Sequence, residues 1–190
     1  MYIFGFGSLI NINSAQKSFR RKLQRRDFIP VILKGYEKIW NSIEYIEFED
    51  EEKVYEGIFL NLQKQPSSTT NGVVLKITPE EFEFLKKREK NYSFIKLDGK
   101  DIEGIDTNEE IYTFITKNED RIAKKSNKFC VIPQKYINLL EEGLSSYNED
   151  FKKEFVNSYS SCPFPIKDGK YRFSDPIQNK FAKDGIGDES

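Results

Sequence analysis

The sequence predicts an α+β fold with a small mixed or antiparallel, barrel-like sheet and flanking helices. Segments rich in Val, Ile, Tyr and Phe dominate the first two thirds of the chain, and helical patterns dominate the last third. The length of 190 residues is typical of one domain. We expect that domain at residues 1–159, followed by an irregular C-terminal extension at 160–190 that packs on the same domain and whose last residues are frayed.

Strands are predicted wherever apolar and β-branched residues cluster between turn formers. The predicted strands are residues 2–6, 30–48, 53–62, 72–77, 91–97 and 110–116. The first of them ends in a turn at Gly7-Ser8, because glycine and serine favour turns. The polar segment QKQPSSTTN, residues 63–71, predicts a loop between two strands.

Three helices carry local start signals. Thr78-Pro79-Glu80-Glu81 is a capping box with proline at the first helical position, and the helix should run to about Lys90. Pro133 opens a second helix, which places Tyr136, Leu139 and Leu140 on one face. Asn148 is the predicted cap of a third helix.

Composition excludes several classes of function. The chain contains no histidine, so Ser-His-Asp and Cys-His catalysis and histidine-bound zinc are excluded. Two distant cysteines, Cys130 and Cys162, provide too few ligands for a structural zinc site. With a net charge of -1, no overall field attracts nucleic acid or an anionic membrane. We therefore expect no metal, and the absence of a signal peptide or a long apolar run favours a cytoplasmic protein.

One carboxylate lies on the face of a helix that should be buried. On the helix that begins at Pro79, Phe82, Leu85 and Tyr92 define an apolar stripe, and Glu89 falls within it. Burial raises the pKa of a carboxyl group, which suits a general acid or base near pH 7. The alternative is a structural glutamate that pairs at the helix end with Arg88, Lys90 or a basic residue from 20–26.

The segment Phe4-Gly5-Phe6-Gly7-Ser8-Leu9 places two glycines at the end of the first strand. Glycine allows a close backbone approach, and N–H groups exposed at such a turn can bind a carboxylate. The segment lacks the GxGxxG and GxxxxGK[ST] patterns of phosphate-binding loops. The alternative is a bulge in an edge strand.

Several short motifs, in the same order, resemble γ-glutamylcyclotransferases. FGFGSLI is similar to the YGSL-type signature of that family, and VYEGIF at 54–59 is similar to its central strand. LKKREKNY at 85–92 resembles the end of its helix with the catalytic glutamate. Tyr112 and Tyr136 stand where the family often has tyrosines. The sequence differs from the family at Phe6, where a tyrosine is usual, and at Lys86, where an aspartate is usual.

The resemblance implies the fold and the chemistry of that family. A γ-glutamyl amide would cyclise to 5-oxoproline and release its amine, with no cofactor and no metal. Glu89 would be the general acid/base. The implied substrate-binding residues are Phe6, Gly7, Ser8, Leu9, Tyr92, Tyr112 and Tyr136. The partner would be this small-molecule substrate, with no nucleic acid and no membrane.

Two other hypotheses remain at this point. Because of Phe6 and Lys86, the chain could be a non-catalytic module that binds a small carboxylate on the same fold. The basic stretch from Lys17 to Arg26 could contact nucleic acid, or one arginine from it could reach a substrate carboxylate, although a solvated helix or loop face also explains it.

Overall fold

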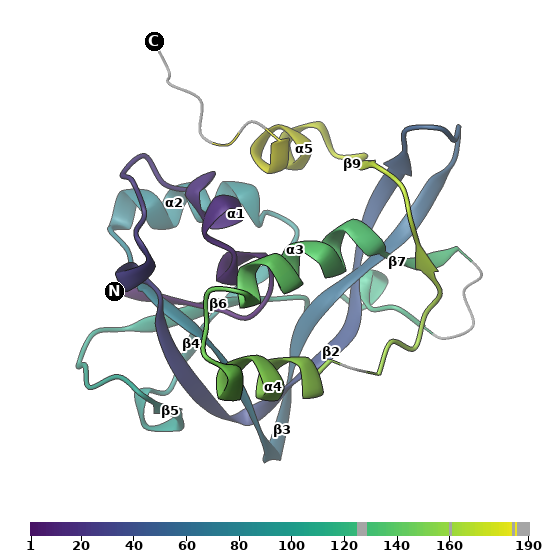
Figure 1. Ribbon diagram of the computed structural model, residues 1–190. Coiled ribbons are helices and arrows are strands. Elements are labelled where there is room, and N and C mark those ends of the chain that lie inside the picture. The colour runs from purple at the N-terminus through teal and green to yellow at the C-terminus, as the bar shows by residue number, and fades with distance from the viewer. Residues whose placement is uncertain (125–128, 160, 184, 186–190) are drawn as a thin grey trace.

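The computed structural model describes residues 1–124, 129–159, 161–183 and 185 (Figure 1). It confirms the predicted α+β class with a curled, mixed sheet. The strands are β1 (Tyr2–Gly5), β2 (Ile29–Phe48), β3 (Val54–Lys76), β4 (Ser93–Leu97), β5 (Ile102–Glu103), β6 (Ile111–Ile115), β7 (Cys130–Pro133), β8 (Ile166–Lys167) and β9 (Tyr171–Phe173). The α-helices are α1 (Ile12–Gln16), α2 (Pro79–Arg88), α3 (Gln134–Leu144), α4 (Glu149–Asn157) and α5 (Pro176–Lys183). Short 3-10 turns include η1 (Ser8–Ile10), η2 (Arg25–Asp27), η3 (Gly99–Asp101) and η4 (Glu119–Arg121).

A long antiparallel hairpin of β2 and β3 forms the frame of the sheet. Its register shifts between Lys34 and Tyr36, where Gly35 has a φ of 76°, a conformation that favours glycine. The predicted loop at 63–71 is wrong, because β3 continues through it. The residues of β3 that pair with β2 jump from Lys64 to Thr69. The unpaired residues between them include Pro66, which has no N–H to donate.

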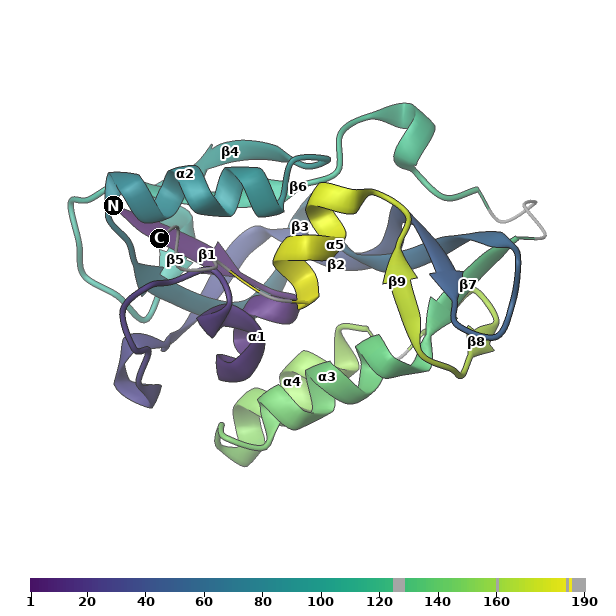
Figure 2. The same cartoon turned by 90° about the horizontal axis from the view of Figure 1, so that it is seen from above.

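The first strand occupies the middle of the sheet, whose main order is β4-β6-β1-β3-β2-β5. β1 pairs antiparallel with β3 and parallel with β6. Figure 2 shows α2 on one side of the molecule, α3 and α4 on the other, and α5 between these two groups. The turn that follows β1 therefore emerges at the centre of the fold, within reach of several helices.

The C-terminal extension is more regular than expected. It contains β8, β9 and α5, and β9 pairs antiparallel with the end of β2. Its residues Tyr171 and Phe173 pack against the hydrophobic core. The prediction of frayed last residues at about 184–190 falls, except for Gly185, outside the described residues.

Candidate active site

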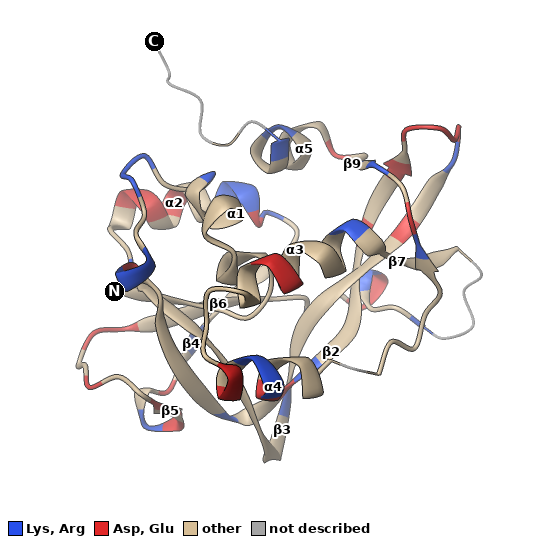
Figure 3. Cartoon of the chain, viewed as in Figure 1, with Lys and Arg blue, Asp and Glu red and all other residues tan. Residues whose placement is uncertain are grey.

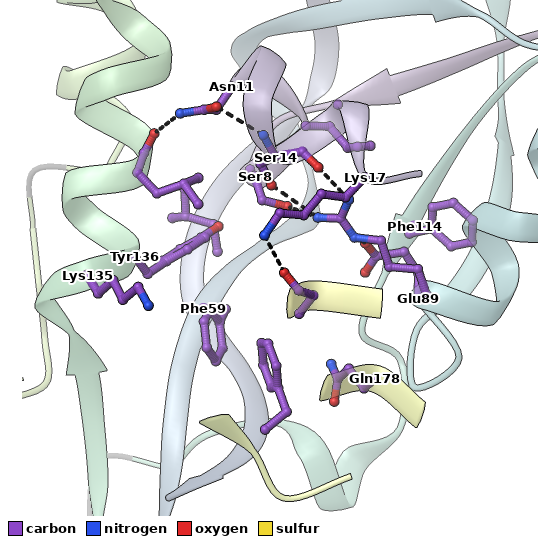
Figure 4. A pocket seen from close by; sticks show the side chains of 18 of the residues that line it. Ser8, Asn11, Ser14, Lys17, Phe59, Glu89, Phe114, Lys135, Tyr136 and Gln178 are labelled. Atoms are coloured by element: carbon purple, nitrogen blue, oxygen red, sulfur yellow. Dashed lines mark hydrogen bonds and ion pairs between the residues drawn. The ribbon is translucent and has the colours of Figure 1, made fainter. Parts of the chain in front are cut away.

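Helix α2 ends immediately before Glu89 and places that side chain at the wall of a cavity. The helix starts at the predicted capping box, in which Thr78 and Glu81 exchange two hydrogen bonds. Phe82 and Leu85 are buried on the face predicted to be apolar. Glu89 continues this face as the cap residue, and its side chain is only 17% exposed. Helical spacing thus carries a carboxyl group to the cavity (Figure 4).

The carboxyl group of Glu89 forms an ion pair with the residue before it. Arg88 Nε lies 3.2 Å from Glu89 Oε1. Burial raises the pKa of Glu89 above its ordinary value, and the positive charge of Arg88 opposes part of that rise. The pairing at the helix end that we considered as a structural alternative is therefore present, but in a residue that also lines the cavity.

Arg88 also ties the loop after β1 to helix α2. Its Nη1 donates to Ser14 O at 3.0 Å and to Ser18 Oγ at 2.7 Å, and its Nη2 donates to Ser8 Oγ at 3.1 Å. Arg88 is itself buried, so these charge-assisted bonds are shielded from water. Because the Ser8 oxygen accepts from Arg88, its hydroxyl proton remains available to a group in the cavity.

The turn after β1 needs its glycines because other groups approach closely. A Cβ on Gly5 would lie 2.7 Å from Leu9 Cβ, and one on Gly7 would lie 2.8 Å from the Tyr136 hydroxyl. In the 3-10 turn, Ile10 N–H donates to Gly7 O, whereas the first N–H groups of a turn have no acceptor inside it. Gly7, Ser8 and Leu9 all line the cavity, so this turn faces the same space as Glu89.

Two of the three tyrosines named from the sequence line the cavity. Tyr136, at the start of α3, packs edge-on against Phe59 with ring centroids 4.9 Å apart. The Tyr92 hydroxyl accepts a hydrogen bond from Ser42 Oγ at 3.2 Å. Burial raises the pKa of both tyrosines, which keeps their hydroxyl groups protonated as donors.

Tyr112, the third of these tyrosines, does not line the cavity. Its hydroxyl donates to Glu110 Oε2 at 2.9 Å in an exposed pair, and its ring packs on Phe82 outside the cavity. Its neighbour Thr113 is buried, lines the cavity and donates to Phe4 O at 2.9 Å. Adjacent residues of a strand point to opposite faces, so Tyr112 and Thr113 lie on different faces of β6.

The cavity has a volume of about 710 Å³, which suits a small molecule. The loop after β1, the end of α2 and the start of α3 form part of its wall. The C-terminal extension, to which we assigned no site residue, supplies a further part with Tyr171, Arg172, Phe173, Gln178, Asn179, Ala182 and Lys183. The sequence does signal the start of α5, because Asp175 caps the N–H groups of Ile177 and Gln178 ahead of Pro176.

The basic segment after α1 is engaged with its own fold. Arg20 and Arg21 form ion pairs with the acidic first turn of α2, and Figure 3 shows the two charges side by side. The Arg25 guanidinium lies 3.7 Å from the ring centroid of Tyr147. Of this basic segment, Lys17 and none of the arginines lines the cavity, and the Lys17 Nζ donates to Ala182 O at 2.6 Å.

The described residues contain neither a metal-binding cluster nor a membrane-spanning helix. Over these residues, no group of three or more Cys, Asp and Glu side chains is arranged to hold a metal ion. In the same part of the chain, none of the helices combines the length and the apolar character required to cross a membrane.

Solved structures with this fold include γ-glutamyl cyclotransferases. YkqA from Bacillus subtilis matches with a TM-score of 0.58 at 22% identity, over 88% of this chain and 56% of that one. A γ-glutamyl cyclotransferase matches with a TM-score of 0.54 at 12% identity, over 96% of this chain and 98% of that one. A yeast γ-glutamyl cyclotransferase specific to glutathione matches with a TM-score of 0.52 at 14% identity, over 83% and 94%.

These matches confirm the predicted γ-glutamylcyclotransferase-like fold. The chain spans only 56% of the length of YkqA. No family model matches the sequence, and no curated protein matches it. The likeness thus establishes the architecture, whereas the chemistry depends on the side chains in the cavity.

Proposed function

We propose that the protein is a γ-glutamylcyclotransferase-like enzyme, which converts a γ-glutamyl amide to 5-oxoproline and a free amine. The observation that carries the proposal is that Glu89 and the glycine turn at Gly7 line one cavity. A carboxyl group with a raised pKa thereby faces a turn whose first N–H groups are not used by the turn itself. The fold shared with γ-glutamyl cyclotransferases supports the same chemistry.

The reaction needs a fixed geometry more than a strong nucleophile. The substrate's α-amino nitrogen attacks its own γ-carbonyl carbon, the ring C–N bond forms and the original amide C–N bond breaks. Because both groups belong to one molecule, holding the reactive conformer removes much of the barrier. The turn at Gly7 to Leu9 and the Ser8 hydroxyl would hold the α-carboxylate and steady the γ-carbonyl oxygen.

Glu89 would move protons from the attacking nitrogen to the departing one. As a carboxylate it accepts a proton from the α-ammonium group and returns it to the departing amine nitrogen; the attacking nitrogen loses its second proton as the ring closes, and the released amine takes it up to leave as an ammonium ion. No water or cofactor enters the balance. A raised pKa makes Glu89 a better proton donor and acceptor near neutral pH, and Arg88 stabilises the ionised form between turnovers. Phe6 lines the cavity without the hydroxyl group of the usual tyrosine, which leaves the orientation of the substrate to Ser8, Tyr92 and Tyr136.

The test is turnover of γ-glutamyl dipeptides and γ-glutamyl amines, followed by detection of 5-oxoproline. Glu89→Gln should lower kcat by about 10²–10⁴-fold, the usual contribution of general acid/base catalysis, while the unfolding midpoint stays close to that of the wild type. Because deprotonated Glu89 is the base, kcat/KM should rise with pH through a pKa above 4.5, the ordinary glutamate value.

Glu83→Gln is the matched control, because Glu83 is 62% exposed on the same helix and pairs with Lys86. It should keep full turnover. Turnover by Glu89→Gln equal to that of the wild type would refute the catalytic role. Thermal stabilisation by a γ-glutamyl compound with no 5-oxoproline formed would instead support the non-catalytic binding module.

A further inference from the structure

A second buried carboxyl group lies behind the cavity. Glu44, on β2, is 2% exposed and does not line the cavity. Its Oε2 accepts from Asn91 Nδ2 at 2.9 Å and from Arg121 Nη1 at 2.9 Å. A buried carboxylate is costly unless it is paired and hydrogen-bonded, so the fold has to supply these partners.

The partners of Glu44 lead directly to two walls of the cavity. Asn91 follows Glu89 by two residues, and its Nδ2 also donates to Gln178 Oε1 at 3.3 Å. Gln178 belongs to α5, is 6% exposed and lines the cavity, as Figure 4 shows. One buried carboxylate therefore joins β2, the segment after Glu89 and the C-terminal helix.

We propose that Glu44 is a positioning residue, which holds Asn91 and, through it, Gln178, so that α5 keeps its place in the cavity wall. The inference rests on the proposed function. α5 has two further attachments: Lys90 Nζ lies 2.5 Å from Asp175 Oδ2, and Lys17 Nζ donates to Ala182 O at 2.6 Å. These two attachments lie near the ends of the helix. Gln178, which Glu44 holds through Asn91, lies on its buried face.

The charged groups around Glu44 act on its pKa. The charged or titratable groups that face Glu44 are Arg121 from η4, and Glu89 and Tyr92 from the segment at the end of α2. Burial raises the pKa of Glu44 to about 7, Arg121 opposes this rise, and the charge of Glu89 adds to it. The charge of Glu89 therefore favours the protonated, uncharged form of Glu44.

The test compares Glu44→Gln with Gln178→Ala. In both variants KM for the best γ-glutamyl amide should rise by about tenfold with a smaller change in kcat, because a wall of the binding site loses its anchor. Amide hydrogen exchange at residues 176–183 should become faster by about tenfold in both.

Glu103→Gln is the control, because Glu103 forms an exposed ion pair with Lys34 on β2 far from these contacts. It should leave KM and exchange unchanged. Wild-type KM and wild-type exchange at 176–183 in Glu44→Gln would overturn the inference. If the wild type forms no 5-oxoproline, the result counts against the proposed function. The exchange measurement needs no substrate, so it still tests whether Glu44 holds α5 in place.

Discussion

Two regions of the molecule bury an ionisable side chain and treat it differently. Glu89 lines the cavity between α2, α3 and α5. Lys38, on β2, is 6% exposed beneath α4, where its Nζ donates to Asn71 Oδ1 and Ser158 Oγ, both at 3.1 Å. The Lys38 ammonium also lies 3.5 Å from the ring centroid of Phe155.

Burial favours the neutral form of both side chains, and this changes their pKa values in opposite directions. Burial raises the pKa of Glu89 and lowers the pKa of Lys38 well below its ordinary value. Lys38 is sealed by its partners and does not line the cavity, whereas Glu89 does. A perturbed pKa therefore identifies a candidate for chemistry only where a ligand can reach the group.

The largest effect that separates the two regions should come from Phe155→Ala. Phe155 is fully buried, covers Lys38, stacks on Phe151 and meets the ring of Tyr159 edge-on. Its truncation should lower the free energy of unfolding by about 3–5 kcal/mol in urea titrations. The kcat of the folded fraction should stay within about twofold of the wild type, because Phe155 does not line the cavity.

Phe94→Ala is the control for this change, since Phe94 is 49% exposed and should cost about 1 kcal/mol. A loss of 5-oxoproline formation by folded Phe155→Ala would show that the α4 side contributes to the site, and the separation of the two regions would then fail.

A pH series sharpens the comparison at Lys38. Between its lowered folded pKa and the ordinary value of 10.5, the unfolded chain holds a proton that the folded chain does not. The wild type should therefore gain stability relative to Lys38→Met as pH rises through this window, by up to about 1.4 kcal/mol per pH unit. Urea titrations of both proteins from pH 6 to 9.5 measure the difference, and a constant difference would contradict the assignment.

The smallest effect is expected at Tyr112. Tyr112→Phe removes an exposed hydrogen bond to Glu110, so stability should change by less than about 1 kcal/mol. 5-Oxoproline formation should stay within about twofold of the wild type, because the hydroxyl lies outside the cavity. A tenfold rise in KM would show that Tyr112 does contribute to the substrate site.

Local patterns predicted those parts of the site that depend on one segment. The capping box and the helical period place Glu89 on the face of Phe82 and Leu85, and this face is buried. The close packing at Gly5 and Gly7 agrees with the glycine-rich turn. The polar segment 63–71 was assigned wrongly, because its strand is held by pairing with β2, a partner that composition does not reveal.

By itself, the sequence determined the class of the fold, the helix that carries Glu89 and the absence of histidine chemistry. These follow from periodicity, capping and residue type, which act within a few neighbouring residues. Only the tertiary structure decided that α5 completes the cavity, that Tyr112 faces away from it and that Glu44 lies behind Glu89. Each of these depends on contacts between segments many residues apart, whose register and docking are set by the packing of the whole chain.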